Sequence, residues 1–168
     1  RSGGRGATAR VSKIASDTAL PAPAVEYQLE VSFEAELPAA FDAMRLAKTS
    51  LKKFTTNIDA GKRADLEPVR ACAVALENSV LKNPDPAMLL RSLRSDEPFS
   101  FRHCVNSAVL GVALARALGL RRQNIHELTM GVLLADIGKL RLPRELLRTN
   151  RRLYPRETEI IQRHVPYG

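Results

Sequence analysis

The chain has 168 residues, of which 45% are hydrophobic, and it carries a formal net charge of +8 at pH 7. This length suits one domain, or a small domain with an appendage, and it allows roughly 68–70% of the unfolded surface to be buried. No apolar run approaches the ~20 residues that cross a bilayer, which argues against a transmembrane helix. The charge favours polyanionic partners such as nucleic acid, anionic lipid or a phosphate-rich small molecule.

Aromatic residues make up 5% of the chain, with no Trp, and they do not interleave with basic residues, so a base-stacking platform for single strands is not supported. The two cysteines, Cys72 and Cys104, lie inside apolar helical patterns. This placement predicts core thiols in a reducing cytoplasm rather than a disulfide framework. The first residues lack an initiator Met and the apolar middle of a signal peptide, which suggests an internal cut or a tag remnant.

Residues 1–24 are rich in Gly, Ala, Ser, Pro and Arg, and we expect them to form a flexible tail or linker. Apolar and polar residues then alternate from Val25 to Phe33, a period of two that predicts an extended strand over residues 25–36. A single strand is not stable alone, so it would pair outside the chain or with a second copy.

Residues 37–95 change to helical spacing and predict lead-in helices. One runs from Pro38 to a cap at Gly61, and the next runs from Asp65, as N-cap, to Asn83. Their apolar seams are Met44, Ala47, Leu51, Phe54 and Ile58 in the first helix and Val69, Cys72, Leu76 and Val80 in the second. The seams predict an antiparallel hairpin. Either they pack on the rest of the chain, or they form the interface of a homodimer.

The remaining elements are also predicted to be helical. Asp85-Pro86 opens a short helix, and a long one runs from Phe101 to Leu118, closed by Gly119. Further helices are expected from Gln123 to Asp136, from Pro143 to Leu147 and from Pro155 to His164. The fold class is therefore predicted to be all-α apart from the N-terminal strand.

The residues that carry chemistry gather in the C-terminal half. Asp136-Ile137-Gly138-Lys139 ends an apolar helical stretch and supplies a carboxylate and an ammonium group, while His103 and His164 could supply imidazole nitrogens for a metal. Each element alone has an ordinary explanation. A lone His is more often surface or core, and Asp-x-Gly-Lys could be a helix end with a Gly cap and a Lys placed to favour the helix dipole.

In order and spacing, His103, the run Leu133-Leu-Ala-Asp136-Ile-Gly-Lys139 and the later His164-Val-Pro-Tyr-Gly resemble the HD-GYP branch of the HD phosphohydrolases. Members of that family are cyclic di-GMP phosphodiesterases of bacterial signalling. The likeness covers roughly residues 45–168. Residues 96–168 are similar to the first part of an HD-GYP domain, which implies an HD-type helical bundle preceded by the hairpin.

The resemblance implies a role for each matching residue. His103 corresponds to a ligand of the first metal, Asp136 to the carboxylate that bridges two metals, and His164 to a ligand of the second metal. Lys139 corresponds to the cation that contacts substrate phosphate. Ala135 stands where the family carries the His of its name, so one ligand is lost.

Other positions bear on the same site. Phe99 stands where a three-metal subgroup carries Glu, so a third metal is not expected, and a later His pair and the Gly-Tyr-Pro loop would fall after residue 168. The cofactor implied is a divalent metal, Fe or Mn, if the site is functional, and otherwise none. Arg144 and Arg148 are candidate contacts for substrate phosphate, because Arg suits bidentate phosphate binding.

These observations predict a degenerate HD-GYP-type domain that binds cyclic di-GMP or a signalling protein with weak or no hydrolysis. Two alternatives stay open: an active phosphodiesterase completed by residues beyond 168, and a helical dimerisation or docking module. Sequence-specific nucleic-acid binding is not expected, since no segment has a compact recognition-helix pattern. The expected location is the cytoplasm.

Overall fold

The computed structural model describes residues 24–93, 99–149 and 151–168, in which every regular element is helical. This confirms the all-α class. The longer helices are α2 (Phe33–Asp59), α3 (Glu67–Lys82), α4 (Pro84–Ser92), α5 (Phe99–Ala117) and α6 (Arg122–Leu134). The shorter ones are the 3-10 helix η1 (Ile137–Arg141), α7 (Arg144–Leu147), α8 (Pro155–Gln162) and α9 (His164–Tyr167). No helix in these ranges is long and apolar enough to cross a membrane.

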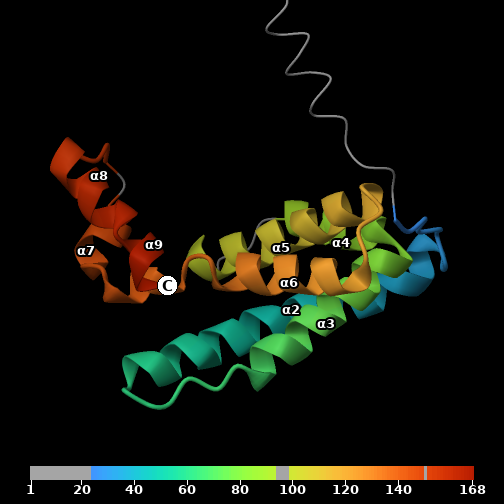
Figure 1. The fold of residues 1–168 in the computed structure, drawn as a ribbon, viewed down its shortest axis with the longest axis horizontal. Helices are drawn as coiled ribbons and strands as arrows, with labels where there is room; N and C mark the ends of the chain where they lie inside the picture. The colour runs from blue at the N-terminus through green and yellow to red at the C-terminus, as the bar shows by residue number, and fades with distance from the viewer. Residues whose placement is uncertain (1–23, 94–98, 150) are drawn as a thin grey trace, which may run out of the picture.

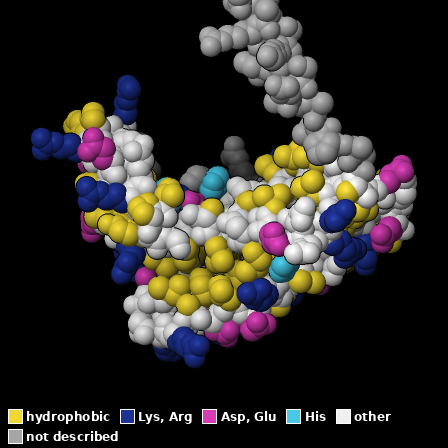
Figure 2. Space-filling view, in the orientation of Figure 1, with side chains coloured by type: hydrophobic (Ala, Val, Ile, Leu, Met, Phe, Trp, Pro, Cys, Tyr) yellow, Lys and Arg dark blue, Asp and Glu magenta, His cyan; other side chains and the backbone are white. Residues whose placement is uncertain are grey.

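Helices α2 to α6 form a bundle, and α7, α8 and α9 form a smaller group at one end of it (Figure 1). In the same orientation, hydrophobic side chains gather in a hollow between the bundle and this C-terminal group (Figure 2). The predicted tail, residues 1–24, lies outside the described residues except for Ala24.

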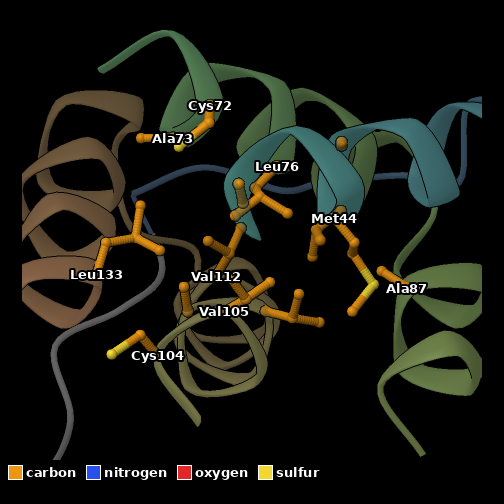
Figure 3. Close-up of a cluster of buried hydrophobic side chains, with 14 of the residues drawn as sticks. Met44, Cys72, Ala73, Leu76, Ala87, Cys104, Val105, Val112 and Leu133 are labelled. Atoms are coloured by element: carbon orange, nitrogen blue, oxygen red, sulfur yellow. The ribbon is translucent and has the colours of Figure 1, made fainter. Parts of the chain in front are cut away.

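Helices α2 and α3 form the predicted antiparallel hairpin, joined by residues 60–66 (Figure 1). Gly61 has a φ of 69°, in the left-handed region that a helix C-terminal glycine provides. Met44 of α2 and Leu76 of α3 are buried together with Val105 and Val112 of α5, and their side chains converge in Figure 3. Of the two uses left open for the apolar seams, the structure therefore shows packing within one chain.

The predicted strand over residues 25–36 is not formed. Residues 24–32 are extended, but they lie against helices and have no strand partner within the described residues. Val25 donates its backbone N–H to the carbonyl of Gly119 at 3.0 Å, and the Tyr27 hydroxyl donates to the carbonyl of Leu120 at 2.9 Å. The predicted alternation of exposed and half-buried residues is present except at Leu29, which is 64% exposed. It arises because one side of an extended segment contacts the bundle.

Helix α2 begins at Phe33, earlier than the predicted Pro38. The Ser32 hydroxyl caps it by accepting the backbone N–H of Ala35 at 3.3 Å. Two acidic residues in the first turn favour this start, because they face the positive end of the helix dipole. The alternating pattern continued through Phe33 and so concealed the change to helix.

The starts of α3 and α4 also differ from the predictions. Asp65 lies one residue before the N-cap of α3, although its carboxylate still accepts the backbone N–H of Glu67 at 3.1 Å. The cap of α4 is Asn83 rather than Asp85, and its side-chain oxygen accepts the N–H of Asp85 at 3.1 Å. The reason is that the first of two nearby prolines, Pro84, takes the opening position of the helix.

The C-terminal half follows the predictions with two changes. Helix α5 ends before Gly119, which has a φ of 65° as expected of a cap. Helix α6 ends at Leu134 rather than Asp136, and a 3-10 helix that was not predicted follows it. The last predicted helix, residues 155–164, is divided into α8 and α9.

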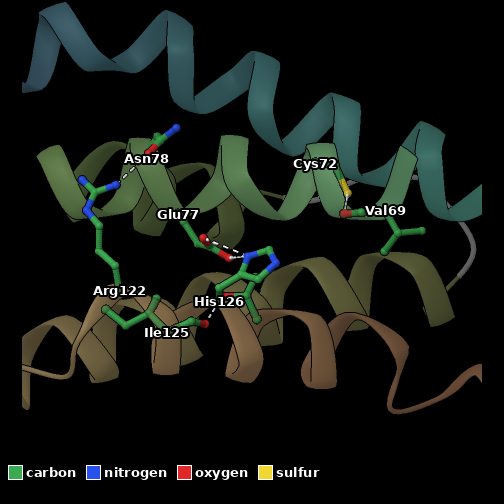
Figure 4. Close-up of polar contacts among 8 residues, drawn as sticks. Val69, Cys72, Glu77, Asn78, Arg122, Ile125 and His126 are labelled. Carbon is green, nitrogen blue, oxygen red and sulfur yellow. Dashed lines mark hydrogen bonds and ion pairs between the residues drawn. The ribbon is translucent and has the colours of Figure 1, made fainter. Parts of the chain in front are cut away.

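A part-buried polar contact joins the hairpin to α6. Nδ1 of His126 donates to the Glu77 carboxylate, 3.0 Å from Oε1 and 3.3 Å from Oε2 (Figure 4). Glu77 is 8% exposed, so its carboxylate depends on this partner for polar contact. Nearby, Nη1 of Arg122 donates to Oδ1 of Asn78 at 3.1 Å. This exposed contact also joins α3 and α6.

Close packing of backbone fixes α9 on η1. A Cβ atom added at Gly138 would overlap the carbonyl oxygen of His164 and lie 2.8 Å from the backbone nitrogen of Gly168. Only glycine permits this approach. The same Gly168 N–H donates to the His164 carbonyl at 3.1 Å and closes α9.

We expect His126→Ala to lower the free energy of unfolding by about 1–3 kcal/mol, because it leaves the buried Glu77 carboxylate without its partner. Denaturant unfolding measures this change. Arg122→Ala is the control and should change stability by less than about 0.5 kcal/mol, since its contact with Asn78 is exposed. Equal effects of the two substitutions would contradict the importance of the part-buried pair.

We expect Gly138→Ala to displace α9, because the obstructing atoms belong to backbone and cannot rotate away. Hydrogen exchange measures this as faster exchange of the Gly168 amide. The matched control is Gly131→Ala in α6, where an added Cβ meets nothing within 4 Å. That change should stabilise the helix by about 0.5–1 kcal/mol. Unchanged exchange at Gly168 in the first variant would show that the contact does not hold α9.

Candidate functional site

The site lies where α6 ends and brings together three of the residues predicted for it. Oδ2 of Asp136 lies 2.6 Å from Nζ of Lys139, and Oδ1 lies 3.6 Å from Nε2 of His164. Each of these side chains is mostly buried, with exposed fractions of 16%, 25% and 20% respectively. One carboxylate therefore has a cation on one oxygen and an imidazole on the other.

Local backbone geometry brings Asp136 and Lys139 together. Asp136 is the N-cap of η1, with φ −96° and ψ 5°, and Lys139 lies three residues further on. In a 3-10 helix, side chains three residues apart are eclipsed, so the ammonium group lies beside the carboxylate. His164 reaches the same carboxylate because α9 packs on η1 through Gly138.

The His164 ring is oriented by its own backbone. Nδ1 lies 2.6 Å from the carbonyl oxygen of Ile161, and since that oxygen can only accept, Nδ1 carries the hydrogen and donates it. Nε2 is then the nitrogen that faces Asp136. A ring held by a carbonyl at one nitrogen, with the other nitrogen directed at the site, is the arrangement common for metal-binding histidines.

Ala135 immediately precedes this cluster but has different surroundings. It is the C-terminal cap of α6, in right-handed helical conformation, and it is exposed. Its side chain lines the apolar hollow together with Phe54 and Ile58 of α2. A methyl group provides no ligand atom, as the sequence indicated.

Helix α5 carries both Cys104, which is buried in the core, and the predicted ligand His103. His103 is exposed in the second turn of α5, and it does not join Asp136 and His164 in a group of three described residues that could hold a metal ion. Cys104 is 7% exposed, and burial raises the pKa of its thiol to about 11, with a further increase from Asp136 and a decrease from Lys139. The sequence predicted Cys104 to be a core thiol, and its burial confirms this.

The residues of this site do not fit the pair of metals that the resemblance implies. The described part of the chain contains no group of three or more His, Cys, Asp or Glu that could hold a metal ion. Oδ1 of Asp136 and Nε2 of His164 could both reach one ion, because metal–ligand distances are ~2 Å. A bridging role would also need Oδ2, which contacts Lys139.

The two arginines predicted to contact phosphate are not part of the cluster. Arg144 forms an ion pair with Asp59, at the end of α2, with a distance of 2.9 Å. Arg148 is exposed at the C-terminal cap of α7. A third arginine, Arg151, donates two hydrogen bonds to Glu157, which lowers the pKa of that carboxyl to about 2. Arg144 and Arg151 thus each pair with a carboxylate of the chain.

An apolar hollow of about 740 Å³ lies beside the site. It is visible in Figure 2 as the cluster of hydrophobic side chains between the hairpin and the C-terminal group. Its walls come from the end of α2, residues 64–66, the end of α6, η1 and α9. The charged side chain in its lining is Arg141, whose guanidinium lies 5.7 Å from the ring centre of Tyr167.

Comparison with known proteins gives one informative relative. The chain is 27% identical over 146 residues to a cyclic di-GMP phosphodiesterase of Pseudomonas aeruginosa. The match covers 87% of this chain but 35% of that protein, so the chain spans about a third of the relative's length. No family profile and no solved structure matches the chain. The chain is therefore a distant homologue of a cyclic di-GMP phosphodiesterase.

Proposed function

We propose that this chain is a degenerate HD-GYP-type domain of bacterial cyclic di-GMP signalling, which binds the nucleotide or a protein partner with weak or no phosphodiesterase activity. The observation that carries this proposal is the convergence of Asp136, Lys139 and His164 beside Ala135, which has no ligand atom. The distant relative supports the choice of nucleotide.

Binding would use the positive charge of the chain. Cyclic di-GMP has two phosphate groups, and a net charge of +8 attracts such an anion before any specific contact forms. At the site, Lys139 is the cation that pairs with Asp136, and its side chain is one quarter exposed. A ligand phosphate could therefore reach the ammonium group from solvent.

Weak turnover follows from the ligand set. Two-metal hydrolysis uses ions that share ligands, activate a water and stabilise the attacking and leaving oxygens of the phosphodiester. Here His103 is apart from the cluster, Ala135 contributes nothing, and Oδ2 of Asp136 binds Lys139. The chain's own residues can hold and orient a phosphate, but they do not supply the ligands for such a centre.

One observation favours a second candidate, an active phosphodiesterase. Nδ1 of His164 donates to Ile161, and Nε2 faces Asp136, which is how a metal-binding histidine is usually supported. Under this alternative, water would occupy the position of the lost imidazole, and further ligands would come from residues outside this chain.

A dimerisation role needs a surface other than the predicted seams. Those seams are buried between α2, α3 and α5, whereas Phe41 and Leu46 of α2 face outward, 56% and 43% exposed. If a homodimer forms through the N-terminal helices, Phe41→Asp should weaken it, and Leu89→Asp, at an exposed position of α4, should not. Sedimentation at tens of micromolar measures both. A wild-type monomer would exclude this role.

Restoring an imidazole tests degeneracy directly. Ala135→His should raise affinity for Mn²⁺ by about 10–100-fold, since a lost metal-site partner typically accounts for at least that much. Calorimetric titration measures the affinity, and cleavage of cyclic di-GMP with Mn²⁺ or Fe²⁺ measures the activity. Ala117→His, at the far exposed end of α5, controls for metal binding by any added imidazole.

The wild-type chain should bind cyclic di-GMP in the presence of a chelator, with an affinity that falls as salt rises, and should cleave it far more slowly than the variant. If the wild-type chain cleaves cyclic di-GMP as fast as Ala135→His does, the hypothesis of a degenerate site is wrong and the alternative of an active phosphodiesterase is supported.

A further inference from the structure

Asp136 is a mostly buried carboxylate, and both of its oxygens face groups of its own chain. We propose that Lys139 is a cation built into this site, which neutralises Asp136 in place of a metal ion and allows η1 and α9 to dock in metal-free protein. This inference does not depend on nucleotide binding, so it can fail or hold separately from the proposed function.

The first step is the need for a counter-charge. The Asp136 side chain is 16% exposed, and an ionised carboxylate removed from water is costly unless a cation or several hydrogen bonds compensate it. In a metal centre, the ions provide that charge. Among the described residues, no group of three or more His, Cys, Asp or Glu could hold such an ion, whereas Lys139 supplies a positive charge from the chain itself.

The second step is the geometry of the lysine. Nζ of Lys139 lies 2.6 Å from Oδ2, the distance of a strong charge-assisted hydrogen bond. The two residues are separated by a single 3-10 turn, so the ammonium is held near the carboxylate by the backbone. A tethered cation does not lose the translational freedom that a free ion would lose on binding.

The third step links this pair to α9. Oδ1 of Asp136 faces Nε2 of His164, the first residue of α9, while Gly138 between Asp136 and Lys139 contacts the backbone of α9. The neutralised carboxylate is therefore part of the surface on which α9 packs. An uncompensated charge at this point would oppose docking.

The experiment uses the full 168-residue chain and follows its melting temperature with EDTA and with 1 mM MnCl₂. We expect the wild-type chain to melt within about 1 °C in the two conditions. Lys139→Met should melt roughly 2–8 °C lower in EDTA, the shift expected when a partly buried charge loses its partner. Mn²⁺ should raise the melting temperature of this variant, because Oδ2 becomes available to the ion.

Two further variants complete the test. Lys139→Arg keeps the positive charge and should behave like the wild type in both conditions. Asp136→Asn combined with Lys139→Met removes both charges and should recover most of the stability lost in the single variant, even if that variant folds poorly. The proposal is overturned if Mn²⁺ stabilises the wild-type chain, if Lys139→Met melts like the wild type in EDTA, or if the double variant is no more stable than Lys139→Met.

Discussion

The burial of α3 is the constraint on which the rest of the molecule depends. This helix packs on α2, α4, α5 and α6, and its seam residues Val69, Cys72, Leu76 and Val80 are at most 1% exposed. Such a core is packed at the density of an organic crystal, so the helices around it have little freedom to shift. The direction of α6, and hence the place where its C-terminal end presents Asp136, follows from this packing. The contact of His126 with Glu77 adds a polar restraint between the same two helices.

The site itself is stabilised by a different kind of contact. Between the bundle and the group α7 to α9 there is little buried apolar packing, and the seam residues of the core have no counterpart there. Helix α9 is held by the close approach of its backbone to Gly138 and by the contact of His164 with Asp136. A region with few apolar contacts opens more readily than a packed core. Substitutions at Asp136, Lys139 or Gly138 should therefore destabilise the C-terminal group more than the bundle. The site can then be altered while the bundle stays folded.

Sequence reasoning succeeded where one local pattern determines structure. Periodic apolar seams predicted α2 and α3, whereas the contact between Asp136 and Lys139 was not predicted, because it depends on the 3-10 turn between them. It failed where a pattern has two structural causes: alternation near Tyr27 reports contact on one side, and helices provide that contact as well as a neighbouring strand does. His103 shows a further limit. The buried stripe of α5 contains Cys104, Val105 and Ala108, whereas His103 is exposed, and the rotation of α5 in the bundle decides which of these neighbours is buried.

Ala135 and Asp136 are adjacent in the chain but have different surroundings. The methyl group of Ala135 continues the apolar lining formed with Phe54 and Ile58. Oδ2 of Asp136 contacts Lys139, so this carboxylate has a counter-charge from its own chain. The apolar lining at Ala135 and the ion pair of Asp136 with Lys139 therefore lie next to each other at the end of α6, and both are formed by side chains of the chain itself.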